Sequence, residues 1–125
     1  MPAIAARRLE AKSTAELVGW TRTYLGLRYS ELGSLAGATT RTAQRWGDAR
    51  DLTVPSGEHR AKLEQLRELK RLLATTFPTN KSVALEWLHR EVPLLQGQRP
   101  IDLIRQGKLR PIIEVLAGAH AGAFA

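Results

Sequence analysis

Hydrophobic residues recur along the chain at the spacing of an α-helix. The clearest stretch is residues 56–76, where charged side chains cover one face and large apolar side chains cover the other: Leu63, Leu66, Leu69, Leu73 and Phe77. Shorter helices are expected over residues 13–25, 30–36, 40–47, 80–91, 100–106 and 111–119. No segment shows the strict alternation of a strand, so the pattern predicts an all-α protein.

Local signals predict where these helices begin and end. Ser13 and Glu16 have capping-box spacing, in which each side chain can bond an amide of the first turn, so a helix is expected to begin at Ser13. Gly26 is expected to stop that helix, and Pro93 is expected to close the one over residues 80–91. Residues 48–57 read as a linker. We therefore divide the chain into residues 1–55 and 56–125.

Composition narrows the choice of function. The 125 residues suit one domain, or one small domain with an appended module. The absence of cysteine excludes disulfides, thiolate metal sites and a catalytic cysteine. The net charge of +7 favours a polyanionic partner, of which nucleic acid is the commonest. The excess positive charge divides almost evenly at Pro55, so it does not point to one half.

Residues 30–47 have the pattern of a helix-turn-helix. Gly33 provides a small residue where the two helices cross, and Gly37 provides a turn residue that tolerates left-handed geometry. Ala38, Ala43 and Trp46 are the apolar positions that would seat the second helix on the first. The spacing of Trp46 favours a place in the core over a stacking surface.

In this register the start of the second helix presents hydroxyl, amide and guanidinium groups, which can reach phosphates and base edges. The alternative is a pair of helices whose exposed face happens to be basic. The candidate DNA-binding residues are Thr39, Thr40, Arg41, Thr42, Gln44 and Arg45.

The pattern of an active site is missing from the sequence. His59, His89 and His120 are far apart, no two ligand-type residues have metal-site spacing, and no glycine-rich phosphate loop occurs. We expect no catalytic residue, no metal, no cofactor and no enzymatic activity. Neither a secretion signal nor an apolar stretch long enough to span a membrane is evident, so a cytoplasmic location is expected.

Two groups of residues resemble a known family. The first is residues 25–33 followed by Arg41-Thr-Ala-Gln-Arg-Trp46. The second is Trp87-Leu88, then residues 99–107 with the pattern Pro-x-Asp-Leu-x-x-x-Gly, then the terminal Gly122-Ala-Phe124. Together they resemble the Xre/MbcA/ParS-type antitoxins, which accompany toxins that carry a RES domain.

The resemblance implies a helix-turn-helix region at residues 1–55 that binds operator DNA to repress its own operon, followed by a helical toxin-binding domain at residues 56–125. The toxin would consume NAD, and the small residues at the carboxyl terminus would cover its active site. A homodimer or a higher hetero-oligomer with the toxin is expected. The residues that the resemblance assigns to the toxin are Gly118, His120, Gly122, Ala123 and Phe124.

Two alternatives stay open. By composition alone, residues 117–125 favour a frayed terminus, whereas the resemblance favours a segment that is ordered by its partner. The leucine face of residues 63–73 is also compatible with a free-standing repressor whose second half only dimerises. Such a repressor would have no toxin partner.

Overall fold

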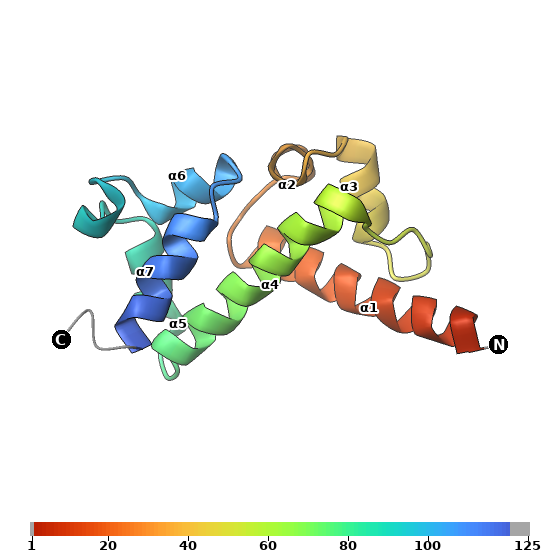
Figure 1. Ribbon diagram of the computed structural model, residues 1–125, viewed down its shortest axis with the longest axis horizontal. Coiled ribbons are helices and arrows are strands. Elements are labelled where there is room, and N and C mark those ends of the chain that lie inside the picture. Colours follow the sequence, from red (N-terminus) through yellow and green to blue (C-terminus); the bar gives the residue numbers. More distant parts are fainter. Residues whose placement is uncertain (1, 121–125) are drawn as a thin grey trace. The chain divides into compact units, whose positions relative to one another are not determined.

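Helices account for nearly all the secondary structure of the protein (Figure 1). The computed structural model describes residues 2–120, with side chains for residues 3–118. Within these residues the only β-pairing is an isolated antiparallel bridge between Val92 and Gln98. The protein is therefore all-α, as predicted. The elements are α1 (Pro2–Thr23), α2 (Tyr29–Ala36), α3 (Thr40–Trp46), α4 (Gly57–Thr76), α5 (Lys81–Leu88), the 3₁₀ helix η1 (Pro93–Leu95), α6 (Pro100–Arg105) and α7 (Arg110–His120).

The chain divides into two compact units, residues 1–63 and 64–125. This division falls inside α4, so the first turns of that helix belong to the first unit and the remainder belongs to the second. The functional division at residues 55 and 56 stays a prediction, because compactness does not tell which residues contact which partner.

Helix α1 begins eleven residues earlier than the capping pattern indicated. Ser13 is exposed and lies inside the helix, so its assignment as a cap was wrong. The preceding residues are mostly alanine, arginine and leucine, which are strong helix formers, and a serine inside a helix is only mildly unfavourable. The core-facing side of α1 starts at Ala11 and includes the buried Thr14 and Val18.

Helices α2 and α3 are joined by a tight turn that depends on two glycines. Gly37 has a φ of 74°, in the left-handed region, and its amide donates to the Ser34 carbonyl at the end of α2. A Cβ atom on Gly33 would lie 2.9 Å from the backbone oxygen of Thr39. The turn therefore passes directly over α2, and only glycine leaves room for it.

Trp46 is central to the core of the first unit. Its side chain is 1% exposed, which confirms that it is a core residue. Ala43, one turn earlier, is fully buried, and helix α3 packs on both α2 and α1. The His59 ring lies against the Trp46 ring, and its Nδ1 is 2.8 Å from the carbonyl oxygen of Ala36. His59 thus bonds to the end of α2 and holds the start of α4 to it.

The second unit buries the predicted leucine face of α4. Leu66, Leu69 and Leu73 are almost completely buried, and Leu72 broadens that face. Helices α5, α6 and α7 supply much of the rest of the core, together with the buried Val92, Leu95 and Leu109 between them. The buried hydrophobic residues of the three helices are Ala84, Leu88, Ile101, Leu103, Ile104, Ile112 and Leu116.

Helix α5 starts where predicted but ends early. The Asn80 side chain accepts a hydrogen bond from the Ser82 amide at 2.9 Å and so caps the helix. The helix stops at Leu88, and Pro93 begins η1 instead of closing α5. Because a residue before proline favours extended geometry, Val92 leaves the helical path and pairs with Gln98.

The short helix α6 begins at Pro100 and ends before Gly107, as predicted. Pro100 occupies its first turn, and Arg99 bonds both oxygens of Asp102 at 2.8 and 2.9 Å. Asp102 therefore pairs with a guanidinium, in addition to its favourable position near the helix start. Within residues 2–120 no helix combines the length and the hydrophobicity needed to cross a membrane.

We expect Gly33→Ala to lower the free energy of unfolding of the first unit by about 1–3 kcal/mol, because the added methyl group must displace backbone atoms. Chemical denaturation followed by circular dichroism would measure this. Gly19→Ala is the matched control, because Gly19 lies in α1 and, apart from adjacent residues and the nearby backbone of that helix, no atom is within 4 Å of the place its new methyl group would take. Alanine should therefore stabilise the protein by about 0.5–1 kcal/mol. Equal stability of the two variants would contradict the close approach of the turn to α2.

Candidate functional site

Helix α3 presents one face to solvent and one to the core. Thr40, Arg41, Gln44 and Arg45 are exposed, and we call these four residues the outer face of α3. The opposite side of the helix is anchored by buried residues, so the backbone of this short helix has little freedom to rotate. The candidate DNA-binding residues named from the sequence therefore lie together on one element.

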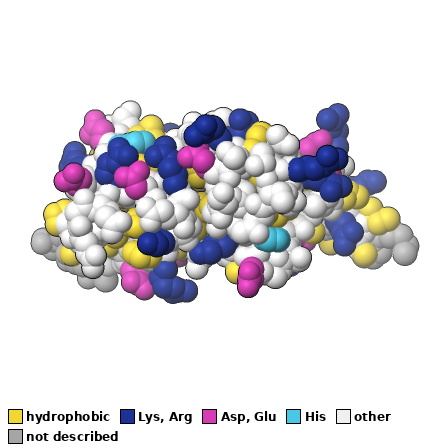
Figure 2. All heavy atoms as spheres, turned by 90° about the horizontal axis from the view of Figure 1, so that it is seen from above, with side chains coloured by type: hydrophobic (Ala, Val, Ile, Leu, Met, Phe, Trp, Pro, Cys, Tyr) yellow, Lys and Arg dark blue, Asp and Glu magenta, His cyan; other side chains and the backbone are white. Residues whose placement is uncertain are grey.

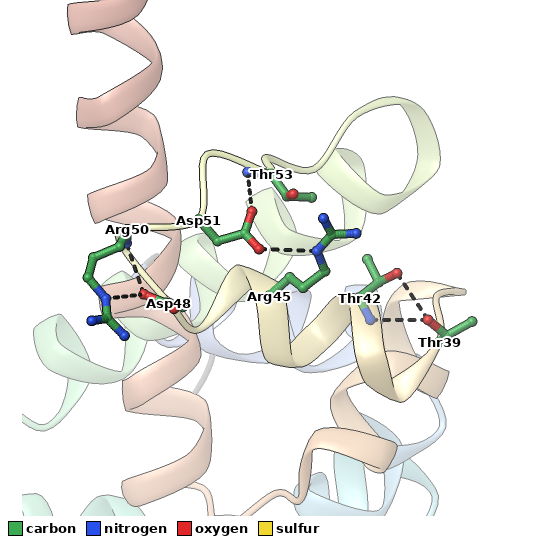
Figure 3. A network of polar contacts seen from close by, with 7 residues as sticks. All are labelled: Thr39, Thr42, Arg45, Asp48, Arg50, Asp51 and Thr53. Carbon is green, nitrogen blue, oxygen red and sulfur yellow. Dashed lines mark hydrogen bonds and ion pairs between the residues drawn. The ribbon is translucent and has the colours of Figure 1, made fainter.

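Two of the six candidates have a structural task. The Thr39 hydroxyl oxygen accepts a hydrogen bond from the Thr42 amide at 3.1 Å, which caps the start of α3. The Thr39 hydroxyl also donates to the Thr42 hydroxyl at 3.0 Å (Figure 3). Both threonines thus fix the beginning of the helix, and the outer face consists of the other four residues.

Arg45 and Arg41 differ in their surroundings. The Arg45 Nε donates to the Asp51 Oδ2 at 3.1 Å, from α3 to the loop that follows it (Figure 3). Arg41 is exposed, and its side chain makes no hydrogen bond or ion pair with the described part of the chain. Arg41 is therefore available to a partner, whereas the orientation of Arg45 is restricted by its bond to Asp51.

The loop after α3 is organised by two aspartates. Asp51 accepts a hydrogen bond from the Thr53 amide at 2.9 Å, and Asp48 accepts one from the Arg50 amide at the same distance. In each case a carboxylate bonds the backbone two residues ahead, which is the geometry of an Asx turn. The Arg50 side chain also pairs with Asp48, with 3.2 Å between Nε and Oδ1.

These hydrogen bonds lower the pKa of both carboxyl groups. The pKa of Asp51 falls to about 2, mainly because Thr53 donates to the carboxylate and secondly because Arg45 does. The pKa of Asp48 is lowered by the amide and side chain of Arg50. Both loop aspartates are therefore ionised at neutral pH.

On the face drawn in Figure 2, positive charge among the described residues does not form a single patch. Figure 2 shows Lys and Arg side chains interspersed with Asp and Glu over the visible face. The net charge alone therefore does not identify a nucleic-acid surface, and the candidate surface is the outer face of α3.

The second group of candidates falls at the end of the described chain. Gly118 is half-buried in the last turns of α7. His120 is the last residue of α7, and its side chain is outside the described set. Gly122, Ala123 and Phe124 lie outside the described residues altogether. Their assignment to the toxin stays a prediction.

Among the residues whose side chains are described, the histidines and acidic residues show no metal-site geometry. His89 Nδ1 lies 2.9 Å from the Leu85 carbonyl oxygen on its own helix, and His59 is engaged with α2. In the part of the chain that the structure describes, no three His, Asp or Glu side chains come together as a metal site would need.

Sequence reasoning missed the two loop aspartates. They lie in the predicted linker, where helical periodicity carries no information. The signal that could have found them is the presence of two aspartates in a segment without helical periodicity, since aspartate readily accepts the amide two residues ahead in an Asx turn. The ion pair to Arg45 could not be anticipated, because it depends on how the loop folds back toward α3.

We expect NMR titration of the Asp51 carboxyl to give a midpoint near 2, well below the usual 3.8. A lowered pKa in the folded state stabilises the protein above the unfolded value, and this contribution is lost as pH falls toward 2. In Arg45→Ala the pKa should stay partly lowered, because the Thr53 hydrogen bonds remain. A midpoint near 3.8 in the unmodified chain would show that the loop does not hold this geometry in solution.

Comparison with known proteins gives three findings. No family model matches the chain. The mycobacterial cidal antitoxin MbcA of Mycobacterium bovis and of Mycobacterium tuberculosis is 28% identical over 100 residues, which covers 80% of this chain and 85% of the antitoxin. A probable mycobacterial cidal antitoxin of M. tuberculosis is 29% identical over 101 residues, covering 79% of this chain and 81% of the relative.

A solved structure agrees with these relatives. A chain in the crystal structure of the M. tuberculosis MbcT–MbcA toxin–antitoxin complex superposes with a TM-score of 0.58 and 26% identity. The match covers 89% of this chain and 96% of that one. Sequence and structure thus agree over most of the length, and the protein is a homologue of the mycobacterial cidal antitoxin MbcA.

Proposed function

We propose that this chain is the antitoxin of a toxin–antitoxin pair. The observation that supports this most strongly is the joint similarity in sequence and structure to MbcA, including a chain solved in complex with a toxin. The similarity spans both compact units instead of one. In this role the chain acts in the cytoplasm by binding its toxin, and it catalyses no reaction of its own.

The partner in this proposal is a RES-domain toxin that consumes NAD. This toxin class is supported by the two sequence motifs, which resemble those of the Xre/MbcA/ParS-type antitoxins. Residues 56–125 bind the toxin, and the segment after α7 covers its active site. The toxin-contacting residues are Gly118, His120, Gly122, Ala123 and Phe124. Small residues with one aromatic side chain suit a narrow cleft, because they add little bulk around a single apolar anchor.

The proposal gives residues 1–55 a second task, the binding of operator DNA. Three properties of α3 support it: its capped start, its buried anchoring side and an outer face of hydroxyl, amide and guanidinium groups. Such groups contact phosphates and base edges when a helix enters the major groove. The α2–α3 pair would then serve as a helix-turn-helix, with α3 as the recognition helix.

The toxin-binding proposal predicts that the full chain inhibits NAD consumption by the RES-type protein encoded beside it, and that a chain ending at Ala121 does not. Truncation removes the segment that would exclude NAD from the cleft. Phe124→Ala should weaken inhibition, since it removes the only aromatic side chain of that segment. The measurement is the rate of NAD loss at increasing antitoxin concentration.

Leu9→Ala is the matched control for Phe124→Ala, because it also replaces a large apolar side chain, 69% exposed, by alanine, but in α1. It should inhibit like the unmodified chain. Full inhibition by the truncated chain would retain the antitoxin role and reject the occluding tail. No inhibition by any form, together with no rescue of growth on co-expression with the toxin, would reject the antitoxin role.

The DNA-binding proposal predicts that Arg41→Ala weakens binding to the operon's upstream DNA and reduces the dependence on salt. Each phosphate contact that is lost lowers the slope of log K against log salt by about 1. Fluorescence anisotropy at several salt concentrations measures both effects. Arg90→Ala removes the same charge from an exposed position of the second unit and should leave affinity and slope unchanged. Identical salt slopes for the two variants would remove Arg41 from the interface.

A further inference from the structure

We propose that Asp51 is a positioning residue that aims the guanidinium of Arg45 at a guanine base in the DNA. The inference rests on the proposed DNA-binding function and adds to it a specificity-determining pair. It assigns Arg45 to base recognition and distinguishes it from Arg41, which has no partner of this kind.

The geometry starts from a carboxylate that is itself held in place. Asp51 Oδ1 accepts the Thr53 amide, and its other oxygen, Oδ2, accepts the Arg45 Nε at 3.1 Å (Figure 3). Each oxygen of one rigid group thus has a defined partner, one in the loop and one on α3. The Asp51 side chain is only 28% exposed, which further limits its motion.

The hydrogen bond at Nε restricts the orientation of the whole guanidinium. Because this group is planar and rigid, a bond to Nε limits the directions in which the two terminal nitrogens can point. The Arg45 side chain is 54% exposed, and the hydrogen bond that it donates to Asp51 uses Nε. The terminal nitrogens therefore retain their donors for a partner that approaches the outer face of α3.

The charge of the pair favours a base over a phosphate. Asp51 is ionised at neutral pH and largely cancels the positive charge of Arg45, and an anionic carboxylate beside the contact repels a phosphate. A guanine edge carries no net charge and presents two acceptors, O6 and N7, that match two parallel N–H donors of one guanidinium. Asp51 thus orients the Arg45 guanidinium without repelling a guanine base.

A second ion pair in the same loop, between Asp48 and Arg50, serves as a matched control. Asp48 and Arg50 form an ion pair of the same kind, with Nε 3.2 Å from Oδ1, and Asp48 also accepts a backbone amide. Arg50 lies two residues from Asp48 in the loop and is 92% exposed, so it does not extend from the outer face of α3. Asp48→Asn removes the same charge as Asp51→Asn without touching Arg45.

The test uses the full chain and a duplex that it selects from a random-sequence library, with a scrambled duplex of equal composition as reference. Each guanine of the selected duplex is replaced in turn by 7-deazaguanine, which lacks the N7 acceptor. At one position the unmodified chain should lose about tenfold in affinity, and Arg45→Ala should be insensitive to the same replacement.

The Asp51→Asn variant should still bind DNA but should discriminate less between guanine and 7-deazaguanine. We expect the loss at that guanine to shrink to about threefold, while affinity for the scrambled duplex rises because one negative charge is gone. Asp48→Asn should also raise affinity for the scrambled duplex but should retain the loss of about tenfold. A purely structural role of Asp51 would instead lower affinity for both duplexes together.

The outcomes separate the two proposals. Full sensitivity of Asp51→Asn to 7-deazaguanine, or no sensitive guanine for the unmodified chain, would overturn the positioning role while DNA binding stands. Failure of the unmodified chain to prefer any selected duplex over the scrambled one would overturn sequence-specific DNA binding itself. Thermal melting of each variant would verify that the substitutions at these surface positions leave the fold intact.

Discussion

The placement of α3 depends on a contact between two stretches of backbone. At Gly33 the helix α2 lies so close to the carbonyls of Ala38 and Thr39 that a methyl group would overlap them. This proximity lets the buried side of α3 reach the core, where Trp46 fills the space between α3 and the start of α4. The cap at Thr39 and the ion pair at Arg45 both act on a helix whose position has already been set by this packing.

The polar contacts of the loop affect the orientation of the arginine side chains more than the stability of the fold. Exposed ion pairs contribute little to folding, because solvent screens them and the side chains lose conformational freedom. Asp48 and Asp51 differ from ordinary surface carboxylates in one respect. Each also accepts a hydrogen bond from a backbone amide, so its orientation does not depend on the ion pair with arginine alone. A surface loop without a core of its own can thereby position a side chain on a neighbouring helix.

Much of the fold could be predicted because the signals are local. The leucines of α4 mark a buried stripe, and the spacing of Gly33, Gly37 and Trp46 indicates two crossing helices. The start of α1 could not be predicted in this way, since a capping pattern at Ser13 is equally compatible with a helix that continues through it. Pro93 accounts for the extended Val92, but the end of α5 at Leu88 lies four residues earlier and has no comparable signal in the sequence.

The candidate site was predictable to a smaller degree. Helical periodicity was enough to place Thr40, Arg41, Gln44 and Arg45 on one exposed side. It could not show that the hydroxyls of Thr39 and Thr42 are used within the helix, nor that a loop carboxylate holds Arg45. These contacts depend on the path of the chain between α3 and α4, which contains no repeated pattern. Residues 121–125 lie outside the structural description, so their role depends on the resemblance alone.

The first turns of α1 have a consequence for the local stability of the chain. Residues 3–9 are all exposed, and Ile4 and Leu9 are 48% and 69% accessible, so no packed core supports this part of the helix. Short helical segments are marginally stable in water when tertiary contacts do not hold them. We therefore expect their amides to exchange with solvent ahead of those of the residues packed around Trp46.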